Sequence, residues 1–198
     1  MKEEPSPVRT LSDIIARLNE DEQRLLASVV IRIEAQKGEI LLKEGDISPG
    51  VFWVESGMIR QFYLKDGRDI TEHFACENSG AFCIKSTVNH EPTRLMVEAL
   101  EKSTLHIISY NGLIALSEKY PVFNTFLRRV LELTLILSQD KADSLRFETA
   151  NDRYERFLRE YPEAAKRATI NHIASYLLMS PETLSRVRSG TLKYRGHK

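Results

Sequence analysis

Three side chains near the C-terminus have the chemistry needed to recognise bases in DNA. Glu182, Ser185 and Arg186 share one face of a predicted helix, and Leu184 and Val187 lie on its opposite, apolar face. Arginine can donate two hydrogen bonds to guanine O6 and N7, glutamate can accept one from the cytosine N4 amine, and serine can contact a base or a phosphate. The pattern predicts a base-contacting helix. Its alternative is an ordinary surface pair of Glu182 and Arg186 in a helical hairpin.

The helix that must position these side chains is the second of two short, closely joined helices. The second helix begins at Ser180, a favoured N-cap, and at Pro181, which a first helical turn tolerates. Such a pair is typical of a helix-turn-helix, whose second helix enters the DNA major groove. In the first helix, an apolar stripe with helical spacing is formed by Ile170, Ile173, Ala174 and Leu177.

Basic residues are concentrated around these two helices. Residues 153 to 198 hold ten of the 28 Lys/Arg and four of the 28 Asp/Glu, which leaves 18 and 24 for residues 1 to 152. A basic segment beside an acidic one indicates a nucleic-acid-binding module attached to another domain. Phosphate contacts, which position a protein on DNA without recognising sequence, are predicted for Ser180, Arg188, Lys193 and Arg195, with Lys198 as a further candidate.

The composition, with 42% apolar and 28% charged residues among 198, is that of an ordinary globular chain. We find no apolar run as long as a membrane span and no signal-peptide core, so we expect a cytoplasmic protein without a membrane partner. Cys76 and Cys83 form no zinc-binding pattern. A metal-dependent jelly-roll enzyme would need closely paired histidines, and none are found. No enzymatic activity and no metal site are therefore predicted.

Between residues 31 and 108, short runs of β-branched and aromatic residues alternate with glycine turns. Asp66-Gly67 is a typical two-residue hairpin turn. Many short antiparallel strands at this spacing predict a sandwich, roll or jelly-roll barrel, preceded by one or two helices between residues 11 and 30. The predicted strands are Ile31–Ala35, Glu39–Leu42, Val51–Val54, Met58–Leu64, Asp69–Ala75, Leu95–Ala99 and Thr104–Ile108.

A long helix without Gly or Pro is predicted from Phe123 to about Phe147. It is apolar on two sides, so it needs two partners: its own β-domain and, by hypothesis, a second copy of itself in a parallel coiled coil. The alternative is a helix buried within one protomer. One apolar side consists of Phe123, Phe126, Val130, Leu133 and Leu137, and the other of Leu127, Leu131, Leu135 and Leu145.

Several segments together resemble the Crp/Fnr family of regulators. Residues 37–46, 52–57 and 67–71 resemble the β-roll of cyclic AMP receptor protein and fumarate-nitrate regulators, residues 99–109 resemble the strands that close it, and residues 180–186 resemble the recognition helix. The resemblance implies an α+β fold with an N-terminal β-roll, which is a double-stranded jelly-roll of the cyclic-nucleotide-binding type. A long dimerisation helix and a C-terminal winged helix-turn-helix follow. The wing is expected to be reduced, because few residues separate Pro162 from Thr169.

The implied organisation is a sensor domain at 1–120, a dimerisation helix and linker at 121–149, and a DNA-binding domain at 150–198. The implied function is a homodimeric transcriptional regulator, paired through helix 121–147, with double-stranded DNA and RNA polymerase as partners. Pro181 replaces an arginine of cyclic AMP receptor proteins, whereas Glu182, Ser185 and Arg186 match the fumarate-nitrate branch. That match implies a near-palindromic operator with TTGA-like half-sites. Because Leu178 replaces a small residue of the family's turn, the alternative is a sensor or adaptor without sequence-specific DNA binding.

The family's effector motif is altered in this chain. Gly80 matches its glycine, but Ala81 stands where cyclic-nucleotide members have a ribose-binding glutamate, and Thr93 stands in the register of their phosphate-binding arginine. Lys85 and Arg94 are the cations nearby, and with these three residues they form the predicted effector pocket. Cyclic nucleotides are disfavoured, an iron–sulfur cluster lacks thiolate ligands, and haem would depend on isolated residues such as His73, His90 and the two cysteines. The effector is left unidentified.

Overall fold

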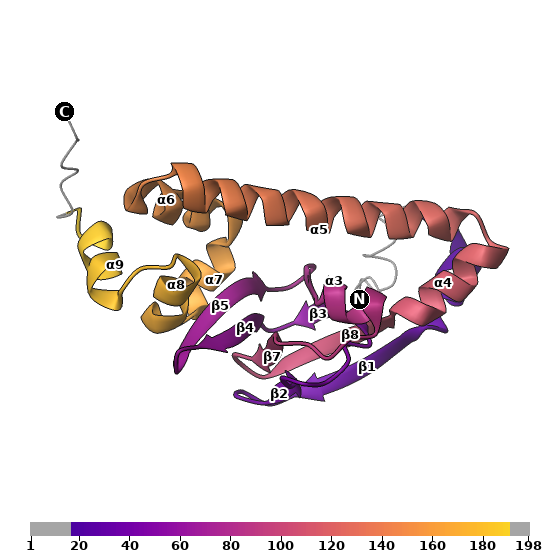
Figure 1. Ribbon diagram of the computed structural model, residues 1–198. Coiled ribbons are helices and arrows are strands. Elements are labelled where there is room, and N and C mark those ends of the chain that lie inside the picture. The colour runs from indigo at the N-terminus through magenta and orange to yellow at the C-terminus, as the bar shows by residue number, and fades with distance from the viewer. Residues whose placement is uncertain (1–16, 191–198) are drawn as a thin grey trace, which may run out of the picture.

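The computed structural model describes residues 17–190. The predicted phosphate contacts Lys193, Arg195 and Lys198, and the first part of the predicted N-terminal helical segment, lie outside the described residues. Figure 1 shows a two-layered β-roll, a long helix that runs across one side of it, and a cluster of short helices at the far end of that helix.

The β-roll consists of two four-stranded antiparallel sheets. The first sheet has the order β1 (Val30–Ala35), β8 (Ser103–Ser109), β3 (Gly50–Ser56) and β6 (Gly80–Phe82). The second has the order β2 (Ile40–Leu42), β7 (Met96–Ala99), β4 (Ile59–Lys65) and β5 (Arg68–Ala75). Residues from both sheets form the core between the layers, among them Phe52, Val54, Ile59, Val97 and Leu105, each fully buried. Alternation along the strands produces this core, because successive side chains point to opposite faces.

A second core joins the roll to the helices on one flank. It contains Leu26 of α2 (Glu20–Ala27), Leu113 of α4 (Tyr110–Lys119), and Phe123 and Phe126 of α5 (Val122–Phe147), packed on Trp53 of the roll. The first turns of α5 therefore face their own protomer. Farther along α5, apolar side chains are solvent-exposed, namely Leu133, Leu135, Ile136, Leu137 and Leu145.

A third core joins the C-terminal helices to the roll. These helices are α6 (Ala150–Glu160), α7 (Pro162–Arg167), α8 (Ile170–Tyr176) and α9 (Pro181–Arg188). Phe157, Ile173 and Leu184 from these helices are buried with Met58 and Phe74 from the roll. Rings of Phe74, Phe157, Tyr161 and Tyr176 pack with centroids 5.3 to 6.2 Å apart.

The α+β fold and every predicted strand are confirmed, with small shifts at the strand ends. Strand β6 and the helices α3 (Ile84–Asn89), α4 and α7 were not predicted. Helix α7 occupies the stretch in which a reduced wing was expected, and between β8 and residue 190 the structure contains no strand. In this part of the chain a short helix therefore stands where a reduced wing was expected.

Candidate DNA-contacting helix and effector cavity

The predicted helix-turn-helix forms as α8 and α9, and each helix has a side-chain cap. The Thr169 hydroxyl accepts a hydrogen bond from His172 N at 3.2 Å, and the Ser180 hydroxyl accepts one from Thr183 N at 3.1 Å. These caps satisfy backbone donors that a helix start leaves open. Between the helices, Leu178 has a φ of 51°, in the left-handed region that favours glycine.

The outer face of α9 carries the three predicted base-contacting residues. Glu182, Ser185 and Arg186 are exposed, whereas Leu184 is fully buried against α6 and α8. A hydrogen bond from the Ser180 hydroxyl, and then the helix backbone, hold the pKa of Glu182 below its ordinary value. The carboxylate is therefore ionised near neutral pH and is a pure hydrogen-bond acceptor, the role that contact with cytosine requires.

Two predicted phosphate contacts are described, and both have partners within the chain. Ser180 caps α9, as given above. The Nε of Arg188 donates to the hydroxyl of Tyr154 at 3.1 Å, and its guanidinium lies 5.6 Å from the centre of that ring. This contact orients Arg188 along α6 while leaving it exposed.

A cavity of about 270 Å³ lies between the roll, α5 and the C-terminal helices. Its polar lining comes from all three parts. The roll contributes Gln61, Glu72 and His73, α5 contributes Thr134, Ser138, Asp140 and Lys141, and the C-terminal helices contribute Glu160, Tyr161 and Tyr176. Sequence reasoning missed this cavity, because residues up to 115 positions apart form its walls.

The polar groups of the cavity are tied to one another. Burial lowers the pKa of His73 to about 4, so its ring is neutral near pH 7. Its Nε2 lies 3.1 Å from the carbonyl oxygen of Gly80 and therefore carries the proton, which leaves Nδ1 to accept from the Tyr161 hydroxyl at 3.0 Å. The ammonium of Lys141 lies 3.1 Å from Glu72 and 4.7 Å from the ring centre of Tyr176.

The five residues of the predicted effector pocket do not come together in this cavity. Gly80 lines it. Ala81 and Thr93 are buried in the roll, where the Thr93 hydroxyl accepts from Leu95 N at 2.9 Å. Lys85 and Arg94 are exposed, and Lys85 lies 3.6 Å from Glu91. The predicted pocket shares only its glycine with the cavity that the structure contains.

No group of three or more His, Cys, Asp or Glu side chains among residues 17–190 is arranged to hold a metal ion. No helix in the same range has the length and apolarity needed to cross a membrane.

This chain is similar to one known domain family, to several regulatory proteins and to solved structures. Residues 32–120 match the cyclic nucleotide-binding domain model. The transcriptional activator protein anr of Pseudomonas aeruginosa is 30% identical over 166 residues, covering 77% of this chain and 66% of that protein. The fumarate and nitrate reduction regulatory protein of Escherichia coli is 29% identical over 199 residues, covering 90% and 78%. The structure of FixK2 from Bradyrhizobium japonicum has a TM-score of 0.70 at 21% identity, covering 85% and 90%.

The roll, the long helix and the helix-turn-helix agree with these matches, which are to a cyclic nucleotide-binding domain and to proteins named as transcriptional regulators. In sequence and in fold the chain is similar to members of the Crp/Fnr family. It spans 66% of the length of the anr protein.

Proposed function

We propose that this protein is a DNA-binding transcriptional regulator, not an enzyme, and that it acts as a homodimer on a near-palindromic operator. The observation that carries the proposal is the outer face of α9, where Glu182, Ser185 and Arg186 are exposed on a capped helix. In the proposed complex Arg186 donates to guanine, Glu182 accepts from cytosine and Ser185 contacts a neighbouring base or phosphate. The expected half-site is TTGA-like, and RNA polymerase is the protein partner that control of transcription implies.

The proposed division of roles follows the order of the parts along the chain. Residues 1–120 act as the sensor, residues 121–149 as the dimerisation helix and linker, and residues 150–198 as the DNA-binding part. Exposed Leu133 and Ile136 on α5, three positions apart on one face, support pairing with a second copy. Such pairing would place two α9 helices on one side of the DNA, with half-sites about one helical turn, roughly 34 Å, apart.

We further propose that a small ligand in the cavity between the roll, α5 and the C-terminal helices gates DNA binding. A ligand there would contact all three parts and so could favour one arrangement of them. Among the described lining residues Lys141 is the only lysine or arginine, beside the carboxylates Glu72, Asp140 and Glu160. A cyclic phosphate would meet a net negative wall. Calorimetry with millimolar cyclic AMP is therefore expected to give no saturable heat, and saturable heat would contradict this assignment.

Selection of bound sequences from random duplexes tests the main proposal. The full chain is expected to enrich paired TTGA-like half-sites. In Arg186→Ala, loss of the guanine contact should weaken binding by about 1–3 kcal/mol and relax the preference at one base pair of each half-site.

Lys166→Gln, an exposed change on another helix, is the matched control and should select the same motif. Enrichment of no motif by the wild-type chain would instead favour the alternative of a sensor or adaptor without sequence-specific DNA binding. An unchanged motif and affinity in Arg186→Ala would remove Arg186 from the base-contacting set.

A further inference from the structure

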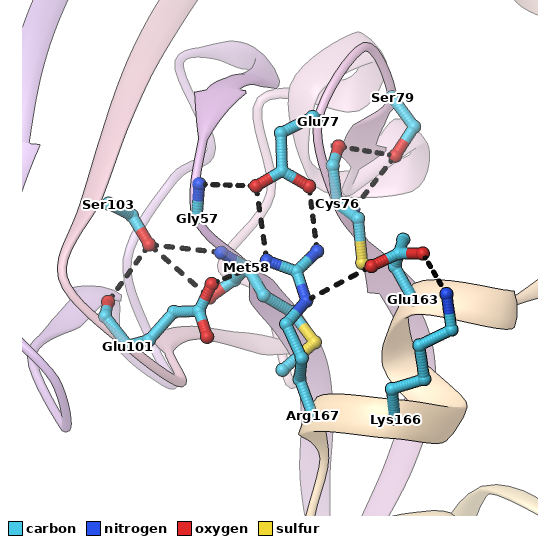
Figure 2. Close-up of polar contacts among 10 residues, drawn as sticks. All are labelled: Gly57, Met58, Cys76, Glu77, Ser79, Glu101, Ser103, Glu163, Lys166 and Arg167. Atoms are coloured by element: carbon cyan, nitrogen blue, oxygen red, sulfur yellow. Dashed lines mark hydrogen bonds and ion pairs between the residues drawn. The ribbon is translucent and has the colours of Figure 1, made fainter.

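Arg167, the last residue of α7, joins the C-terminal helices to the roll. Figure 2 shows its guanidinium pointing from α7 toward Glu77 and Glu101. Nη2 lies 2.7 Å from one oxygen of Glu77 and Nη1 lies 3.1 Å from the other, so that pair is bidentate. Nη1 also donates to Glu101 at 2.6 Å. We call this set, Arg167 with Glu77 and Glu101, the Arg167 bridge.

The roll side of the bridge is built from three turns at one end of the sheets. Glu77 lies in the turn between β5 and β6, and Glu101 lies in the turn between β7 and β8. Glu77 also accepts a hydrogen bond at 2.9 Å from the backbone N of Gly57, in the turn between β3 and β4. A Cβ on Gly57 would come within 2.3 Å of the Ser103 hydroxyl, so this turn can approach its neighbour closely only because it carries glycine.

The pairing of Arg167 with Glu77 favours the charged form of both groups. The hydrogen bond to Glu77 raises the pKa of Arg167 above its ordinary value, and hydrogen bonds from Arg167 and backbone amides outweigh burial to lower the pKa of Glu77. The three side chains are 25%, 37% and 34% exposed. Ion pairs this exposed contribute little to stability, but a planar bidentate contact fixes orientation.

A second contact farther along the same interface restricts rotation about the bridge. The Ser175 hydroxyl of α8 lies 2.8 Å from the Thr71 hydroxyl of β5, and it accepts a hydrogen bond from Thr71 N at 3.1 Å. Two separated polar contacts, added to the close packing of the shared apolar core, restrict the angle between the C-terminal helices and the roll more than either contact would by itself. The C-terminal helices are therefore held at one angle to the roll.

We propose that the Arg167 bridge is a positioning device that sets the spacing between the two half-sites this regulator accepts. The inference rests on the proposed function as a DNA-binding dimer. The roll is packed on α5, α5 is the proposed dimer contact, and the bridge ties α9, through α7 and α8, to the roll. Changing the operator spacing by one base pair moves a half-site by about 3.4 Å and about 35° around the duplex. A fixed angle between the C-terminal helices and the roll cannot follow that displacement.

The test measures affinity as a function of half-site spacing. Full-length protein is titrated into labelled duplexes that carry the selected half-sites at the preferred spacing or with one base pair added or removed. Wild type is expected to prefer its own spacing by about tenfold or more. Two variants remove the bridge from opposite sides: Arg167→Gln, and Glu77→Gln combined with Glu101→Gln. Both should lower the preference at least about threefold while keeping the same half-site sequence.

Lys166→Gln is the matched control, because Lys166 is adjacent, exposed and paired with Glu163 of its own helix at 2.7 Å. It should keep the wild-type spacing preference. If the double variant fails to fold by circular dichroism, the single variant Glu77→Gln, which retains Glu101, takes its place.

Three outcomes would overturn the inference. The first is an unchanged spacing preference in folded bridge variants. The second is a uniform loss of affinity at every spacing with a smaller salt dependence, confined to Arg167→Gln, which would identify Arg167 as a phosphate contact. The third is the absence of binding to any duplex by wild type, which would overturn the proposed function as well, whereas the first two would leave it intact.

Discussion

Leu178 shows how a single residue can be strained in a turn that nevertheless forms. The resemblance implies a small residue at this position of the turn. With leucine there, Leu178 N still donates to Ser175 O at 3.2 Å and Met179 N to Ala174 O at 3.0 Å. The φ of 51° places its Cβ against its own backbone. The side chain itself is 49% exposed, so packing compensates the strain only partly.

Leu178→Gly is therefore expected to stabilise the protein. Glycine adopts this conformation without the Cβ clash, and the gain should be about 1 kcal/mol in the free energy of unfolding, measured by urea denaturation. Leu178→Ala is the control, because it shortens the side chain but keeps the Cβ and should show no such gain. Equal stability of the two variants would mean that the backbone strain at this position is negligible.

At the scale of elements, α5 changes its surroundings along its length. Phe123, Phe126 and Leu127 near its start are buried in the protomer, and Leu133 and Ile136 farther on are 47% and 53% exposed. An apolar surface of this kind on a helix indicates a partner. The sequence predicted two apolar sides of this helix. In the structure, burial depends on the position along the helix as well as on the side: apolar residues near its start are buried, and those farther along are exposed.

Replacing Leu133 and Ile136 together by glutamate should abolish self-association. Two charges on the proposed seam would have to be desolvated in a dimer, so sedimentation equilibrium at micromolar concentration should report the 22.7 kDa protomer. The exposed, polar Asn124, near the start of the same helix and on another face, offers the control Asn124→Asp, which should leave the mass distribution of wild type unchanged. The same distribution for the double variant and wild type would place the dimer contact elsewhere.

Sequence patterns could predict the helices and strands whose own residues show a characteristic spacing or cap. Alternating strands, the uninterrupted helix α5 and the capped pair α8 and α9 all carry such signals. Helix α4 does not, because it contains Gly112, a poor helix former. A Cβ at Gly112 would come within 2.6 Å of Val29, so packing requires the glycine that local propensity disfavours. Strand β6 is three residues long and depends on its partner β3.

Of the candidate sites, one could be predicted from the sequence and two could not. Glu182, Ser185 and Arg186 share a helix, so their common face follows from spacing alone. The cavity and the Arg167 bridge do not, because Arg167 and Glu77 are 90 positions apart in the sequence. No periodicity along the chain encodes a contact between two elements that tertiary packing brings together.

At the scale of the whole molecule, His73 couples the contact between the roll and the C-terminal helices to pH. Burial lowers its pKa from 6.5 to about 4, so between these values the unfolded chain binds the additional proton. Stability is therefore full above pH 6.5 and falls as the pH decreases toward 4. His172 at the same interface has a pKa lowered chiefly by burial and next by Arg60, and it acts in the same direction.

Urea denaturation at pH 7 and pH 5 is expected to show a loss of about 1–3 kcal/mol in acid. His73→Gln keeps a donor for Gly80 and an acceptor for Tyr161 but does not titrate, so it should reduce that loss. The exposed His90 provides the control His90→Gln, whose pH dependence should match wild type. An identical acid response of His73→Gln and wild type would exclude His73 as the source.

The third core has a consequence for how this protein could be divided into fragments or fused to others. Phe157, Ile173 and Leu184 lie in the C-terminal helices, but the same core is completed by Met58 and Phe74 from the roll. A fragment that begins at residue 150 would expose that apolar surface to water. The helix-turn-helix is therefore not expected to fold as an independent fragment. A chimera that joins it to a different β-roll would need matching apolar side chains at the positions of Met58 and Phe74.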